Sequence, residues 1–287
     1  MLILRNRNFL IYGLGLSGRY CLNFLNKSNK VDIYDDFKKN LSTGNKKFFI
    51  SKKKITKKNY DYIVISPGIN IRTCSLKDYL KKNRKKIITD LDIFYYLNQN
   101  NIIIAITGTN GKSTTSKLIN DILIKNKQDV RLIGNIGNSA LGEKNISQKT
   151  IFIVEISSYQ IEYSKYFKGN ISAILNIAPD HLERHLTFKK YLKVKIKLLE
   201  NQPINSKSFI NKQDKIIINF IKKKKIKSKI KKITVNFKKN FLKQIKNPYF
   251  RSVDSLTNLK FAIEITKLFN VKNKTIIKTV NSFSNLS

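Results

Sequence analysis

Two glycine-rich loops each follow a short apolar run and precede a stretch with helical periodicity: Gly13 to Gly18, and Gly108 to Gly111. This strand–loop–helix order is typical of parallel α/β sheets. Other apolar runs alternate with helical stretches, which predicts parallel strands joined by right-handed crossovers. The expected strands are residues 8–12, 31–34, 60–65, 102–106, 151–156 and 171–177. The expected helices are residues 17–27, 113–126 and 187–200, with a short helix and a linker over 90–100.

The length of 287 residues corresponds to about two domains. The helix and linker over residues 90–100 separate two α/β units, so we predict domains at 1–92 and 93–287. The expected fold is a Rossmann-like domain followed by a P-loop-type parallel-sheet domain. Ligands of such sheets bind at the carboxyl ends of the strands, where both glycine loops lie.

Lysine dominates the charge of the chain. Lys and Arg total 57 against 18 Asp and Glu, a formal net charge of +39, but only eight of the 57 are arginines. Because arginine's planar fork suits bidentate phosphate and base-edge recognition, its scarcity argues against nucleic acid as a partner. We favour compositional drift that places lysines on solvated surfaces, with selected binding of a polyanion as the alternative. The segment 207–246, with fifteen lysines and one acid, is the strongest case for either.

The remaining composition bounds the class of protein. A hydrophobic content of 41% is enough for a buried core, so the chain is not a disordered one. Two distant cysteines, Cys21 and Cys74, exclude a disulfide scaffold and a cysteine-based zinc site, and they suit a reducing cytosol. No apolar run approaches the roughly 20 residues of a membrane span. We therefore expect a soluble cytoplasmic protein.

The first loop, Gly13-Leu-Gly-Leu-Ser-Gly18, matches the pattern G-x-G-x-x-G, and Asp35 follows the next strand at the spacing of a ribose-binding acid. Glycines let a backbone approach a diphosphate, whose charge a helix N-terminus favours. The motif predicts binding of a nucleotide diphosphate without selecting the nucleotide. The alternative is a tight turn that only packs.

The second loop, Gly108-Thr-Asn-Gly111-Lys112-Ser113-Thr114, is a shortened P-loop, because Ile106 stands where a strict P-loop has glycine. Its backbone amides can still face phosphate oxygens. Lys112 supplies a positive charge for the β- and γ-phosphates, and Ser113 can bind Mg²⁺. A purely structural glycine turn is the alternative.

Acidic and histidine side chains follow two later strands. Glu155 ends the run 151–156, where a carboxylate is costly unless a cation or donor is near, so we predict a second Mg²⁺ ligand, with a capped strand end as the alternative. His181 and His185 lie in the cluster 176–185. Contact with phosphate or Mg²⁺ is the favoured interpretation; zinc and a solvated or capping pair are the others.

Lys195 lies on the apolar face of the helix predicted over residues 187–200. At 100° per residue, Phe188, Leu192 and Leu199 form one apolar stripe, and Lys195 falls in the middle of it. Burial lowers the pKa of an amine, and a neutral amine can react with CO₂ to give a carbamate, a carboxylate-like metal ligand. The alternative is a stem that snorkels to solvent.

Together with Gly134-Asn135-Ile-Gly137, the segment 155–162 and Ser66-Pro67-Gly68-Ile69, these motifs resemble the Mur ligase family in the right order from about residue 8 onward. The nearest branch adds D-glutamate to UDP-N-acetylmuramoyl-L-alanine in peptidoglycan precursor synthesis. The resemblance implies that domain 1–92 holds the UDP-sugar and domain 93–287 is the central ATP-binding domain. In this branch ATP phosphorylates the alanine carboxylate, and the D-glutamate amine attacks the acyl phosphate.

The resemblance also assigns residues. It implies catalytic roles for Lys112, Lys195 and His181, and two Mg²⁺ ions, one held by Ser113 and Glu155 and the other by His181 and carbamylated Lys195. The residues implied for ATP are Gly108, Thr109, Asn110, Gly111, Lys112, Ser113, Thr114 and Asn258. The residues implied for the UDP-substrate are Leu14, Ser17, Asp35, Ser66, Asn135, Ser157 and Ser158.

The sequence departs from the family pattern at two places, and these departures leave other functions open. Members carry a C-terminal domain that binds the amino acid and closes over ATP, whereas residues 281–287 resemble the end of the central domain. We therefore expect that domain to be absent and activity to be impaired, unless a separate chain supplies it. Asp254-Ser255 stand where the family usually has His-Asn, although Asn258 remains. The other hypotheses are a non-catalytic nucleotide-binding remnant and a basic polyanion-binding protein.

Overall fold

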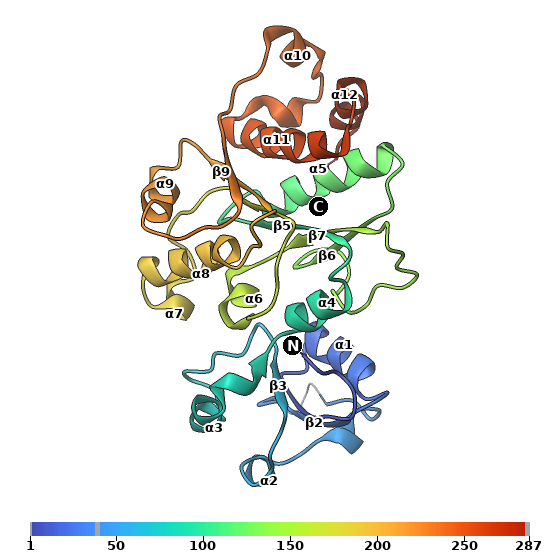
Figure 1. Ribbon diagram of the computed structural model, residues 1–287, viewed down its shortest axis with the longest axis vertical. Coiled ribbons are helices and arrows are strands. Elements are labelled where there is room, and N and C mark those ends of the chain that lie inside the picture. The colour runs from blue at the N-terminus through green and yellow to red at the C-terminus, as the bar shows by residue number, and fades with distance from the viewer. Residues whose placement is uncertain (1, 38–40, 285–287) are drawn as a thin grey trace. The chain divides into compact units, whose positions relative to one another are not determined.

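A computed structural model of the protein describes residues 2–37 and 41–284, and Figure 1 shows its helices and strands. The chain divides into two compact units. Unit 1 contains residues 1–99, 139–143 and 162–167, and unit 2 contains residues 100–138, 144–161 and 168–287. Each unit is built on a parallel sheet, which confirms the α/β fold class that the alternating runs predict.

The sheet of unit 1 has the strand order β2-β1-β3-β4. Adjacent side chains of β1 point to opposite faces, and Phe9 and Ile11 lie in one core cluster while Leu10 and Tyr12 lie in another. Both faces are therefore covered, which explains why the strand is a continuous apolar run. The strands are β1 (Asn8–Tyr12), β2 (Lys30–Tyr34), β3 (Tyr62–Ile65) and β4 (Ile87–Ile88), and the helices are α1 (Leu16–Leu25), α2 (Lys52–Ile55), α3 (Lys77–Lys82) and α4 (Asp90–Leu97).

The sheet of unit 2 has the order β10-β9-β8-β5-β7-β6, with parallel pairing throughout its described strands. The strands are β5 (Ile102–Thr107), β6 (Val130–Gly134), β7 (Ile151–Glu155), β8 (Ile171–Ile174), β9 (Lys207–Asn211) and β10 (Lys229–Ile233). The helices are α5 (Lys112–Lys125), α6 (Ser158–Tyr163), α7 (Leu182–His185), α8 (Phe188–Glu200), α9 (Lys215–Ile221), α10 (Lys239–Gln244), α11 (Val253–Thr266) and α12 (Asn273–Asn281).

Helices cover both faces of this sheet (Figure 1). On one face α5 and α11 pack together, and their apolar side chains join Ile104 and Ile106 in the largest core cluster. On the other face α8 and α9 pack over Ile174 and Ile210. Because β5 lies between β8 and β7 in the sheet, the glycine loop that follows β5 has a neighbouring strand on each side.

Several boundaries predicted from the sequence are wrong. The strand 171–177 ends at Ile174, because the chain then turns and the Asn176 carbonyl accepts from the Thr109 N–H at 3.0 Å. The strand predicted over 60–65 begins at Tyr62, whereas helix α4, which ends at Leu97, agrees with the short helix and linker predicted over 90–100. The prediction also omits strands β4, β6, β9 and β10 and helices α2, α3, α6, α7 and α9 to α12. Most of these elements are short or lysine-rich, so their apolar periodicity is weak. Helix α11 is neither, but it is buried on almost all sides, so no single apolar stripe marks it.

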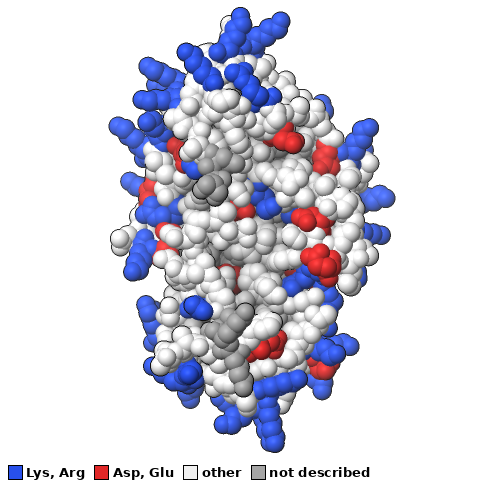
Figure 2. All heavy atoms as spheres, turned by 180° about the vertical axis from the view of Figure 1, so that it is seen from behind, with Lys and Arg blue, Asp and Glu red and all other residues white. Residues whose placement is uncertain are grey.

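The lysine-rich segment 207–246 is folded. It forms β9, α9, β10 and α10, burying Phe209, Ile210 and Ile217 while most of its lysines stay exposed. Figure 2 shows Lys and Arg side chains around the edges of the visible face, including the end that carries α10 and α12. No helix in the described part of the chain has the length and apolarity needed to cross a bilayer.

Candidate active site

In the loop between β5 and α5, the backbone of Gly111 lies close to the side chain of Asn258. Gly111 has a φ of +78°, and a Cβ there would lie 2.2 Å from Asn258 Oδ1 of α11. Only glycine combines this left-handed backbone with that contact. The residues predicted for ATP, from Gly108 to Thr114 and Asn258, are thus brought together at the N-terminus of α5, where backbone N–H groups favour phosphate.

Two lysines contact the carbonyls of this loop. Lys112 Nζ donates to the carbonyls of Gly108, at 3.1 Å, and Thr109, at 2.8 Å. Lys195 Nζ donates to the same Gly108 carbonyl at 2.7 Å. Burial lowers the pKa of Lys112. Lys195 is 1% exposed, and burial followed by the charge of Lys112 lowers its pKa to about 7. The helical stripe predicted this burial, and the side chain does not reach solvent.

Glu155, at the end of β7, is fully buried beside these cations. Its Oε1 accepts from Asn135 Nδ2 at 3.1 Å, and among the described residues its Oε2 has no hydrogen-bond partner. A buried carboxylate oxygen without a donor is costly unless a cation supplies the missing interaction. This orphaned oxygen fits the predicted Mg²⁺ site. Ser113 is the second residue of α5, directly after Lys112 of the same loop.

His181 follows β8 at the rim of the site. Its Nδ1 lies 3.2 Å from the Tyr159 hydroxyl and its Nε2 lies 3.3 Å from Asp180 Oδ2, and its side chain is 44% exposed. Tyr159 also donates to Glu183 Oε1 at 2.9 Å. Within the described residues, no three His, Cys, Asp or Glu side chains form a metal cluster.

Tyr191 joins the loop, the lysine and the histidine, and the sequence analysis missed it. Its hydroxyl lies 3.1 Å from Thr109 Oγ1, its ring lies 4.9 Å from Lys195 Nζ, and the rings of Tyr191 and His181 are 6.4 Å apart. The available signal was its position four residues before Lys195, which places both side chains on one face of α8.

The two histidines have different surroundings. His185 is buried, and its Nε2 lies 3.0 Å from Ser158 Oγ. Ser157 Oγ donates to Gln160 Oε1 at 3.1 Å. The two serines predicted for the substrate channel thus have partners within their own unit, and both histidine rings lie beside Tyr191, His185 at 5.4 Å and His181 at 6.4 Å between ring centroids.

The first glycine loop, in unit 1, is braced by the residues predicted to hold the UDP-sugar. Asp35 Oδ2 accepts from the Leu14 N–H at 2.6 Å, and Ser66 Oγ donates to the Gly13 carbonyl at 2.7 Å. Ser17 hydrogen-bonds to Asp90. Leu14, Ser17, Asp35 and Ser66 therefore meet at one loop. The other predicted substrate residues, Asn135, Ser157 and Ser158, belong to unit 2.

Comparison with known proteins gives the family. A sequence model of the Mur ligase middle domain matches residues 106–277. The UDP-N-acetylmuramoylalanine--D-glutamate ligase of Clostridioides difficile (strain 630) is 32% identical over 225 residues, which cover 75% of this chain and 50% of the relative. The enzyme of the same name from Rickettsia bellii (strain RML369-C) is 30% identical over 310 aligned positions, covering all of this chain and 68% of the relative.

The fold has solved counterparts. The crystal structure of UDP-N-acetylmuramate:L-alanyl-gamma-D-glutamyl-meso-diaminopimelate ligase from Neisseria meningitides superposes with a TM-score of 0.63 at 13% identity, covering 98% of this chain and 99% of that one. This similarity concerns the fold alone. The chain spans about half the length of the first curated relatives that it matches. On the middle-domain match and these relatives, the chain belongs to the Mur ligase family.

Proposed function

We propose that the protein ligates D-glutamate to UDP-N-acetylmuramoyl-L-alanine at the expense of ATP. The observation that carries the proposal is the gathering of Lys112, Glu155 and Lys195 at one glycine loop, at the carboxyl ends of β5 and β7. His181, after β8, lies beside Tyr191, whose hydroxyl contacts that loop. The names of the relatives supply the two substrates.

The chain's own groups suit phosphoryl transfer. The amides that open α5 bind the triphosphate, and Lys112 exchanges its loop carbonyls for phosphate oxygens. An alanyl carboxylate oxygen attacks the γ-phosphorus and ADP leaves, which gives an acyl phosphate. The D-glutamate amine then attacks the carbonyl carbon, phosphate leaves, and the amine loses a proton. The carboxylate thereby gains the leaving group that an amide bond requires.

The proposal includes two Mg²⁺ ions. Ser113 and Glu155 would hold one, which satisfies the orphaned Glu155 oxygen, and His181 and the Lys195 carbamate would hold the other. The carbamate forms when the neutral Lys195 amine bonds to CO₂ and releases a proton. Mg²⁺ supplies positive charge that offsets the charge on the phosphates.

The test is release of phosphate from ATP in the presence of UDP-N-acetylmuramoyl-L-alanine and D-glutamate. It is run on the chain alone and with the C-terminal part of the Rickettsia bellii relative added, because this chain spans 68% of that protein. We expect turnover that Lys112→Ala lowers about 100-fold, as for loss of one charge-stabilising donor. The exposed Lys189→Ala on α8 is the matched control and keeps the rate.

Thermal melting separates binding from catalysis. A ligand that binds the folded state alone raises the melting temperature. Stabilisation by ATP and the UDP-sugar without turnover in either mixture supports the non-catalytic nucleotide-binding alternative. Absence of stabilisation by both ligands rejects the proposal altogether.

A further inference from the structure

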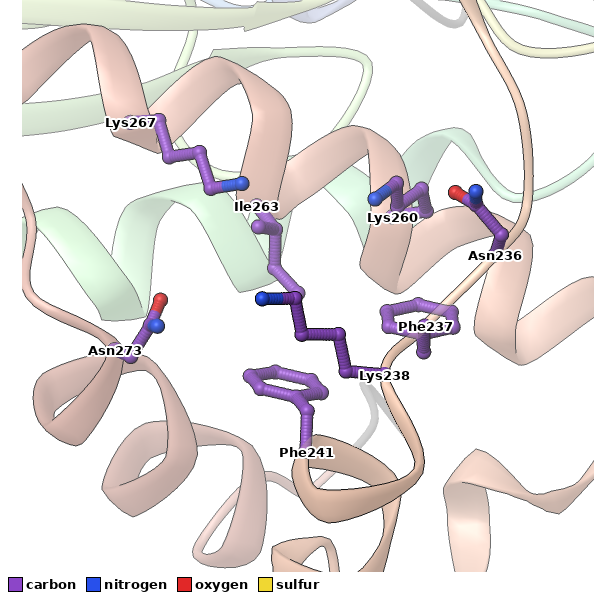
Figure 3. A pocket seen from close by; sticks show the side chains of 8 residues that line it. All are labelled: Asn236, Phe237, Lys238, Phe241, Lys260, Ile263, Lys267 and Asn273. Carbon is purple, nitrogen blue, oxygen red and sulfur yellow. The ribbon is translucent and has the colours of Figure 1, made fainter.

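A basic groove lies on unit 2 between the segment 236–241 and helices α11 and α12 (Figure 3). It consists of a pocket of about 540 Å³ and an adjoining one of about 490 Å³, which share Lys238, Phe241 and Asn273. We call these two pockets together the basic groove. Nothing in the ligase chemistry proposed above uses it.

The basic groove is separate from the ATP loop. Lys260 and Ile263 of α11, and Lys267 directly after its last residue, follow the spacing i, i+3, i+7, so they share one face and line the groove. Asn258, which contacts Gly111, comes two residues before Lys260 and therefore lies about 200° away around the helix. A ligand in the groove would leave the nucleotide loop free.

Positive charge in the basic groove is only partly compensated. Its lysines are Lys238, Lys260, Lys267, Lys274 and Lys278, and neither pocket is lined by Asp or Glu. Glu264, beside it, pairs with Lys260 at 3.3 Å and Lys267 at 3.2 Å. Within the described chain, no ion pair involves the other three lysines. The groove therefore presents free ammonium groups along its length to an anion.

Aromatic surface accompanies this charge. The rings of Phe237 and Phe241 are parallel, with centroids 5.7 Å apart, and both are partly exposed. Lys260 Nζ lies 5.3 Å from the centroid of Phe237. Figure 3 shows the Lys238 side chain extending between the two rings and α11. Aromatic faces next to ammonium groups match a ligand that has flat bases on a phosphate backbone.

We propose that the basic groove binds single-stranded nucleic acid, with phosphates along the lysines and a base against the phenylalanine rings. Two connected pockets suit a strand that continues beyond one nucleotide. Lysine acts on phosphate as a point charge, without the bidentate fork that arginine offers to base edges, so the binding is insensitive to sequence. A duplex keeps its bases stacked and offers none to the rings.

The test measures fluorescence anisotropy of a labelled oligothymidylate with the full chain at several salt concentrations. In the groove variant, Lys238→Gln, Lys274→Gln and Lys278→Gln are combined. Loss of three phosphate contacts lowers the slope of log affinity against log salt by about 2, because each contact contributes roughly 0.7 for a single strand. The control combines Lys52→Gln, Lys53→Gln and Lys54→Gln in the exposed α2, which changes net charge equally and keeps the slope.

A second variant, Phe241→Leu, keeps apolar volume and removes the ring. We expect it to weaken binding about tenfold with an unchanged salt slope, because stacking does not release counterions. Circular dichroism melts of each variant confirm folding. Equal loss of affinity in the groove and control variants would overturn the proposal in favour of net charge alone. Equal affinity for duplex DNA, or displacement of the strand by an equal concentration of AMP, would overturn it as well.

Discussion

Replacing Gly111 by Ala tests the geometry of the ATP loop directly. The backbone at this position has a φ of +78°, and an L side chain there costs about 1–2 kcal/mol. The new Cβ would also meet Asn258 Oδ1 at 2.2 Å and Asn258 Nδ2 at 2.8 Å. Asn258 is buried, so its displacement is an overpacking change of about 1–3 kcal/mol.

The expected loss is therefore about 2–5 kcal/mol in the free energy of unfolding of unit 2. For a unit of this size, about 2–4 °C of melting temperature corresponds to each kcal/mol, so Gly111→Ala should lower its transition by at least about 4 °C. Differential scanning calorimetry measures the shift. Gly111→Ala combined with Asn258→Ala removes the clash but keeps the backbone cost, so the double variant should be more stable than the two single shifts predict.

Two results would refute this reasoning. One is a Gly111→Ala protein that melts at the wild-type temperature, which would show that the loop does not hold the left-handed conformation. The other is strict additivity of Gly111→Ala and Asn258→Ala, which would show that the side chain of Asn258 does not occupy the space beside the glycine.

Three further predictions concern stability. Asp92→Ala should lower the free energy of unfolding by at least about 3 kcal/mol in a denaturant titration, because this fully buried carboxylate accepts from four N–H groups and two hydroxyls. Asp78→Ala, at an exposed position, should change the free energy of unfolding little. Burial alone would raise the pKa of Glu264, but its lysine partners lower it to about 2. The stability that the Glu264 carboxylate contributes is therefore present above pH 4.5 and is lost as pH falls towards 2. Glu264→Gln should remove that part of the pH dependence of the melting temperature. Gly18→Ala should destabilise unit 1, because its Cβ would lie 1.9 Å from a loop carbonyl, while Gly44→Ala meets no atom within 4 Å and should melt near wild type.

Local patterns in the sequence were enough for much of the fold. The strands β1, β5 and β7 are buried on both faces of their sheets, so each stands out in the sequence as a short continuous apolar run. The edge strand β10, of which Ile233 is the one buried residue, has no such pattern. Its lysines face solvent, and its place in the sheet comes from pairing with β9, which no local signal specifies.

In the candidate site, too, local spacing predicted some features, and contacts between distant residues fixed the others. Helical spacing alone puts Lys195 on the apolar face of α8, and its 1% exposure agrees. Spacing could not show that Lys195 and Lys112 donate to the same Gly108 carbonyl, because that contact joins α8 to a loop 87 residues away. Nor could it show that Asp35 and Ser66 support the first loop through hydrogen bonds.

The amino-acid order by itself determined the two glycine loops, the strands that precede them and the order of the family's motifs, because these depend on neighbours within a few residues. Only the tertiary structure decided that Tyr191 joins Thr109 to Lys195, that one oxygen of Glu155 lacks a donor in the described chain, and that a basic groove opens on the far face of α11. Such contacts join groups distant in sequence, and packing of a whole sheet with its helices fixes them.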